Sequence, residues 1–229
     1  MKLYTNTVSP LLLNTIHKLM AFAELSSFRI VGGTALSLQL GHRGSDDIDL
    51  FTDAIYGSVD FEGIDKRIRE NFKYVDASIP GSSHVGKPYF IGNSNTEFIK
   101  VDVFYTDPYC FPIIIQDDIR LAAVEDIIIM KLGIVSCEQG GRKKDFWDLH
   151  ELFNSFTLES MIALYIKYSF SKVSFAEILQ KLTDFTRADV DFTPRCLKGK
   201  YWELIKLDFE EEVMRLNGKA GASDHLVLI

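Results

Sequence analysis

Residues 32–51 read GGTALSLQLGHRGSDDIDLF and hold the most informative pattern in the chain. The last part, residues 47–51, alternates acidic and apolar side chains, which is the period of a strand with one polar face. Asp47 and Asp49 are therefore expected to point to the same side of that strand. Two carboxylates this close repel each other unless a divalent cation lies between them, so the pair predicts a site for Mg²⁺ or Mn²⁺.

A glycine pair opens the same segment, at a predicted strand-to-helix turn. Gly32 and Gly33 come directly before a predicted helix, whose unpaired N–H groups and positive dipole end can hold phosphate oxygens. The hydroxyl of Thr34 is expected to add a phosphate contact. Closer to the metal pair, Arg43 is expected to act as an ionic brace and Ser45 as a hydroxyl near phosphate or metal. The turn and these side chains form the predicted nucleotide-binding set.

A third carboxylate is expected on another strand. Nucleotidyl transfer uses metal ions to neutralise charge on the triphosphate and to align the attacking hydroxyl, and one more acidic ligand is usually needed. Residues 100–104 read KVDVF, which places Asp102 on the face opposite its apolar neighbours. We nominate Asp102 as the third metal ligand. The alternative is a surface or salt-bridged residue at a strand edge.

A second polar block lies in the C-terminal half. Residues 144–148 read KDFWD on a predicted helix, where Asp145 and Asp148 share one face. Asp148 is expected to point at a cleft, whereas Asp145 fits a helix-start dipole partner equally well. Lys131, in the preceding predicted helix, is expected to bind the β- and γ-phosphates as a mobile charge, and Asp148 to orient it or the acceptor. The alternative for Lys131 is a lysine that reaches solvent without a function.

Composition limits the class of protein. The chain has 229 residues, 47% hydrophobic side chains and a formal net charge of −7, so it is expected to fold around a sizeable core and not to bind nucleic acid indiscriminately. Any RNA contact needs a local basic patch, and the run at 141–144 is the favoured one. The apolar stretches fall short of a bilayer span and the N-terminus lacks signal-peptide features, so no membrane contact and a cytoplasmic location are expected.

The two halves of the chain differ in their periodicity. The first half is expected to mix helices and strands, and the second to be helical. Strands are predicted near 28–31, 47–51, 74–79, 88–91 and 97–105, and helices near 9–23, 35–40, 60–72, 121–135, 143–153, 158–170, 175–185 and 201–216. The predicted fold class is therefore α+β, with an α/β core at 1–116 and a helical domain at 117–229 that closes the active-site cleft.

These motifs resemble those of a known family. The Gly-Gly-Thr turn followed by SDDID at 45–49 resembles the signature of the DNA polymerase β-like nucleotidyltransferase superfamily, whose core has a small mixed sheet. Within it, GHRGSDDIDLF at 41–51 looks like the AbiEii/AbiGii-type nucleotidyltransferase toxins. KDFWD at 144–148 resembles that family's lysine–aspartate–two residues–aspartate motif, and Lys131 stands where members carry an active-site lysine.

The resemblance implies an activity and partners. It implies a metal-dependent enzyme that transfers a nucleotide from NTP to an acceptor, RNA such as tRNA, and that acts as the toxin of a toxin–antitoxin pair with a cognate antitoxin protein. Two alternatives stay open: a small-molecule nucleotidyltransferase of the antibiotic-modifying kind, and a degenerate module that binds nucleotide without turnover. Intact Asp47, Asp49 and Lys131 speak against the degenerate module.

Overall fold

The structure is a computed structural model that describes residues 2–76 and 84–224. It divides into two compact units, Met1–Asp126 and Ile127–Ile229, and the division falls inside helix α4 (Val124–Ser136). The sequence-based boundary at 116/117 falls instead between two strands that pair with each other. Each unit is described by itself below.

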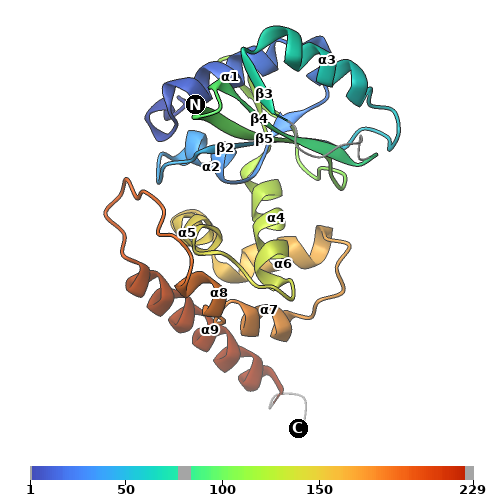
Figure 1. Cartoon of the computed structure of the whole chain (residues 1–229). Helices are drawn as coiled ribbons and strands as arrows, with labels where there is room; N and C mark the ends of the chain where they lie inside the picture. The colour runs from blue at the N-terminus through green and yellow to red at the C-terminus, as the bar shows by residue number, and fades with distance from the viewer. Residues whose placement is uncertain (1, 77–83, 225–229) are drawn as a thin grey trace. The chain divides into compact units, whose positions relative to one another are not determined.

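The N-terminal unit is built on a seven-stranded mixed sheet, in which the strand order is β3-β4-β5-β2-β1-β7-β6. Figure 1 labels β2, β3, β4 and β5 of this sheet. The strands are β1 (Arg29–Ile30), β2 (Asp47–Thr52), β3 (Tyr74–Asp76), β4 (Gly86–Ser94), β5 (Glu97–Tyr105), β6 (Ile114–Gln116) and β7 (Ile119–Leu121). β2 lies near the centre, parallel to β5 and antiparallel to β1. The predicted α+β class with a small mixed sheet is confirmed, and the predicted extension of β3 to Ile79 lies outside the described residues.

Helices flank this sheet. They are α1 (Pro10–Met20), α2 (Gly32–Leu40) and α3 (Phe61–Asn71), with short 3₁₀ turns η1 (Thr5–Thr7) and η2 (Ala23–Leu25). The start of α1 follows from its sequence, because the Ser9 hydroxyl accepts the Leu12 N–H and Pro10 occupies the first turn. Gly41 ends α2 with a left-handed conformation, as its position predicts.

The β6–β7 hairpin was not predicted from the sequence. Each strand has three residues, which is too short for a clear alternation, and no element was predicted for residues 114–120. The turn between the strands holds Asp117 and Asp118 at φ values of 49° and 60°. Two consecutive residues with positive φ give the turn type whose twist suits a tight hairpin, and Asp is one of the residues that tolerate it.

The second unit is helical, as predicted. After α4 come α5 (Lys143–Leu152), α6 (Leu158–Tyr168), α7 (Phe175–Lys181), α8 (Thr186–Asp189) and α9 (Trp202–Asp224). Phe146 on α5 is fully buried, and its ring meets those of Phe185, Trp202 and Phe209 at centroid distances of 5.1, 6.0 and 5.4 Å. These edge-to-face contacts join α5 to α9. In the part of the chain that the structure describes, no helix has the length and apolar character needed to cross a bilayer.

Candidate active site

Two aspartates lie on one face of the central strand. Asp47 and Asp49 are half-buried and alternate with the buried Ile48 and Leu50. In the parallel pairing of β2 with β5, Asp49 lies beside Asp102. The pair therefore shares a face, as the alternation predicts, and the third carboxylate is its cross-strand neighbour.

The glycine turn lies directly against the second aspartate. Gly32 has φ +62°, and a Cβ on it would come within 2.7 Å of Asp49 Oδ2. A side chain at this position would therefore be strained and would also meet the carboxylate. Because α2 begins at Gly32 and receives no side-chain cap from Val31, its N-terminal end faces the carboxylate site without a capping side chain.

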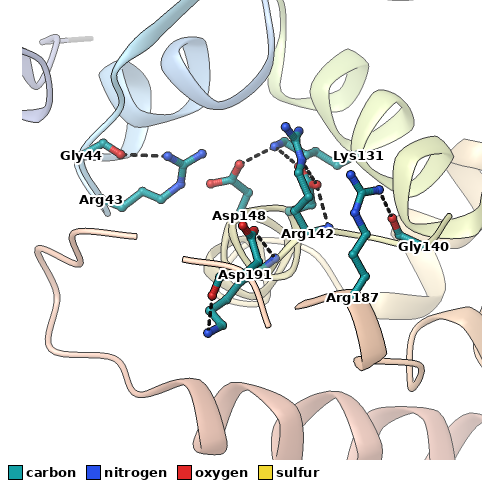
Figure 2. A network of polar contacts seen from close by, with 10 residues as sticks. Arg43, Gly44, Lys131, Gly140, Arg142, Asp148, Arg187 and Asp191 are labelled. Carbon is teal, nitrogen blue, oxygen red and sulfur yellow. Dashed lines mark hydrogen bonds and ion pairs between the residues drawn. The ribbon is translucent and has the colours of Figure 1, made fainter. Parts of the chain in front are cut away.

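Arg43 places a positive charge at the same helix end. A Cβ on Gly33 would lie 2.2 Å from Nη2 of Arg43, so the guanidinium packs against the first turn of α2. The side chain of Arg43 is buried, and its Nη1 donates to the carbonyl oxygen of Gly44 at 2.8 Å (Figure 2). A guanidinium beside the positive end of a helix dipole favours an anion there, which fits a phosphate group.

Two buried hydroxyls hold the turn against the strand. Thr34 Oγ1 and Ser45 Oγ share a hydrogen bond of 2.8 Å, and Thr34 Oγ1 also donates to the carbonyl oxygen of Asp47. Ser45 N in turn donates to the carbonyl oxygen of Thr7 at 2.9 Å. These bonds give Thr34 and Ser45 a positioning role within the protein, while their contact with phosphate stays a prediction.

The carboxylates suit a hard divalent cation. Among the described residues, Oδ1 of Asp102 is buried without a hydrogen-bond partner, which leaves an oxygen acceptor beside Asp49. Within the same residues, no group of three or more His, Cys, Asp or Glu side chains is placed to hold a metal ion. Mg²⁺ is commonly held by one or two protein carboxylates together with phosphates and water, so Asp47 and Asp49 fit this ion. Asp102 as a third ligand stays a prediction.

In the helical unit, Lys131 is enclosed between two aspartates. Its Nζ lies 2.7 Å from Asp145 Oδ1 and 2.6 Å from Asp148 Oδ2, and all three side chains are buried (Figure 2). Burial tends to raise the pKa of Asp145, but the charge of Lys131 and the guanidinium of Arg142 outweigh it, so that pKa lies below its ordinary value. The lysine, predicted as a mobile charge, is fixed in an ion-pair cluster in this structure.

Asp145 has a larger part in this cluster than its sequence position suggested. It accepts the backbone N–H of Arg142 at 3.1 Å and its Nε–H at 3.0 Å, directly before the first turn of α5. The same carboxylate binds Lys131, so it serves the helix start and the buried cluster together. The sequence showed the shared helix face of Asp145 and Asp148, and that spacing was the available signal.

The expected contact of the basic run 141–144 with RNA needs one correction. Lys143 is buried: its Nζ donates to the carbonyl oxygen of Asp191 at 2.9 Å, and its backbone N–H donates to the Asp191 carboxylate at 3.1 Å. Arg187 nearby donates to the carbonyl oxygen of Gly140 at 2.8 Å (Figure 2). Lys143 therefore fastens the segment after α8 to α5 and does not offer its charge to a polyanion.

Comparison with known proteins agrees with this arrangement. Residues 17–215 match the family described as "Nucleotidyl transferase AbiEii toxin, Type IV TA system". The chain belongs to the AbiEii nucleotidyltransferase toxin family. This confirms the family that the motifs at 41–51 and 144–148 suggested, and membership implies a cognate antitoxin. The uncharacterized protein aq_aa25 of Aquifex aeolicus is similar to this AbiEii-family chain, with 27% identity over 215 residues, covering 86% of this chain and 92% of its own length.

Solved structures show the same fold. JHP933 from Helicobacter pylori superposes with a TM-score of 0.57 at 17% identity, covering 96% of this AbiEii-family chain and 97% of that one. MenT4, the nucleotidyltransferase toxin Rv2826c from Mycobacterium tuberculosis, superposes with a TM-score of 0.52 at 13% identity, covering 89% and 83%. At these identities the likeness establishes the fold, and family membership establishes the nucleotidyltransferase class.

Proposed function

We propose that this AbiEii-family chain transfers a nucleotide from an NTP to an RNA acceptor such as tRNA, in a reaction that depends on Mg²⁺ or Mn²⁺. The observation that carries the proposal is the close approach of β2 to the glycine turn: a Cβ on Gly32 would lie only 2.7 Å from Oδ2 of Asp49. The carboxylates proposed to hold the metal and the helix end proposed to bind phosphate therefore adjoin within one unit.

Each group has a defined task in this proposal. Asp47 and Asp49 hold the metal, which when bound supplies charge neutralisation on the triphosphate and aligns the attacking hydroxyl. The N-terminal end of α2 and Arg43 bind phosphate oxygens. Gly33 has no side chain, which lets the Arg43 guanidinium lie close to this helix end. Ser45 and Thr34 hold the turn in register with β2.

The buried cluster of the helical unit is proposed to support the same reaction. Lys131 contributes positive charge toward the β- and γ-phosphates, and Asp148 fixes the lysine at 2.6 Å. Asp145 adds a second anchor at 2.7 Å, which keeps the ammonium in one place. Because the ammonium is buried and paired with both carboxylates, its contact with phosphate stays a prediction.

Labelled NTPs, Mg²⁺ and total RNA test the proposal directly. We expect label to enter RNA with the natural protein, and Asp47→Asn and Asp49→Asn to abolish transfer while remaining folded. Asp46→Asn is the matched control, because Asp46 is the exposed neighbour of the pair and is expected to keep full activity. Label on a small molecule would instead indicate an antibiotic-type enzyme, and no label on either would indicate a nucleotide-binding module.

A further inference from the structure

A lysine stands among the three carboxylates of the N-terminal unit. In the parallel register of β2 and β5, Lys100 lies beside Asp47, and Asp102 lies beside Asp49. Because side chains two residues apart on a strand share a face, all four groups lie on the same side of the sheet. Lys100 was not predicted as a site residue, although its spacing of two residues from Asp102 places both on one strand face.

The ammonium is bound to the third carboxylate. Lys100 Nζ lies 2.5 Å from Asp102 Oδ2, and the side chain of Lys100 is 43% exposed against 19% for Asp102. Burial tends to lower the pKa of Lys100, but the hydrogen bond to Asp102 and the negative charges of Asp102, Asp49 and Asp47 outweigh it, so that pKa lies above its ordinary value. The lysine therefore experiences the field of the whole carboxylate group.

The ammonium of Lys100 offsets part of the repulsion between the neighbouring carboxylates. Three carboxylates on one face of two neighbouring strands disfavour each other, and one ammonium relieves part of that cost. Lys100 engages Oδ2 of Asp102, whereas among the described residues Oδ1 is buried with no hydrogen-bond partner. One oxygen of Asp102 is thus held by the lysine, and the other suits a further cation.

We propose that Lys100 is a displaceable internal counter-ion, which occupies the carboxylate face when no divalent cation is bound and which weakens metal binding by competing for Asp102. The proposal rests on the proposed metal site at Asp47 and Asp49. The side chain of Lys100 is long, flexible and nearly half exposed, so its ammonium can move to solvent when the metal enters.

Direct measurement of Mn²⁺ binding, by calorimetry and by electron paramagnetic resonance, tests this without an activity assay. Lys100→Met is expected to bind Mn²⁺ about tenfold more tightly than the natural protein, because one competing charge is removed. Lys100→Arg keeps the charge and is expected to stay near the natural affinity. Unchanged or weaker binding by Lys100→Met would overturn the role of Lys100.

Lys87→Met is the matched control. Lys87 also forms a 2.5 Å ion pair, with Asp65, but its register position beside Val103 puts it on the other face of the sheet. Its Mn²⁺ affinity is expected to equal that of the natural protein. A failure of both the natural protein and Lys100→Met to bind Mn²⁺, or full binding by Asp47→Asn, would instead contradict the proposed metal site itself.

A second measurement uses the natural protein alone, so it does not depend on the folding of a variant. Reductive methylation of lysines, followed by mass spectrometry, is expected to label Lys100 more rapidly when Mg²⁺ is added, because the ammonium leaves Asp102. Labelling of Lys87 is expected to stay constant. Equal labelling of Lys100 with and without saturating Mg²⁺ would show that the ammonium is not displaced.

Discussion

The ammonium of Lys131 lies 2.6 Å from Oδ2 of Asp148, and both side chains are almost completely excluded from solvent. A cation in this position contributes to stability, because its charge offsets the cost of burying the carboxylates around it. Asp145 makes the second contact, and together the three side chains connect α4 with α5.

Lys131→Met is therefore expected to destabilise the helical unit. The variant leaves two buried carboxylates without their lysine, and breaking a buried ion pair from one side costs about 3–5 kcal/mol. Urea unfolding is expected to show a loss of this size in the free energy of unfolding. Lys144→Met, at the start of α5 and less buried than Lys131, is the control. A loss below about 1 kcal/mol in Lys131→Met would contradict the structural role of the cluster.

Gly33→Ala is expected to weaken NTP binding by about tenfold or more. The added Cβ would lie 2.2 Å from Nη2 of Arg43, and the guanidinium must leave the first turn of α2 to make room. Stability is expected to change less, since only a side-chain end is displaced. Gly218→Ala is the control, because a Cβ there meets nothing within 4 Å. Calorimetric titration with unchanged NTP affinity in folded Gly33→Ala would argue against phosphate binding at this turn.

The parts of the fold that the sequence predicted are those with local patterns. The Asp-Ile-Asp alternation of β2 and the cap of α1 are both local, and the structure has both. The β6–β7 hairpin was missed because strands of three residues carry no period, and its stability comes from pairing with β1.

Burial of charged residues was the harder feature to predict. Lys143 looked like part of a solvated basic run, yet Asp191, far along the chain, accepts its bonds. The roles of Lys100 and Asp145 were also missed or only partly predicted. Strand register brings Lys100 to its carboxylate neighbours, and helix packing brings Asp145 to Lys131. Local sequence identifies the charge, but only the assembled unit identifies its partner.

The helical unit is expected to lose stability as pH falls below about 6.5, the ordinary pKa of histidine. Lys200 Nζ donates to Nδ1 of His150, so the ring is neutral and its Nε2 donates to Asp208. Burial lowers the pKa of His150, the charge of Lys200 lowers it further, and the bond to Asp208 offsets only part of this. Protonation therefore opposes folding: the stabilisation is complete above pH 6.5 and is lost as pH falls through the folded pKa.

Urea unfolding at pH 7.5, 6.5 and 5.5 measures this effect. His150→Gln is expected to show a flatter profile over this range, because its side chain does not titrate. The neighbouring carboxyl of Glu151 has a pKa that burial tends to raise but that Lys198 and Lys200 hold below 4.5, so its own contribution is lost at lower pH. Identical slopes for the natural protein and His150→Gln would rule out His150 as the group responsible.

Tyr4→Ala is expected to raise the apparent NTP constant by several-fold with little change in turnover. The Tyr4 ring covers Gly41, where a Cβ would lie 2.5 Å from Cδ1, and the Tyr4 N–H donates to the carbonyl oxygen of Leu38 at 2.8 Å. Loss of the ring loosens the loop that carries Arg43, which acts on ground-state phosphate binding. Tyr4→Phe keeps the ring and is expected to behave as the natural protein. An equal defect in both variants would show that the ring is not what supports NTP binding.

The short strand β1 has a consequence for how the chain is synthesised. Its two residues pair with Phe51 and Leu50 of β2 on one side. On the other side Ile30 pairs with Leu121 of β7, which is synthesised much later. A nascent chain on the ribosome therefore exposes an open sheet edge until β7 has emerged, long after Asp47 and Asp49 have left the exit tunnel. Translation that terminates before residue 119 is therefore expected to yield a fragment with an unpaired sheet edge, which is prone to aggregate.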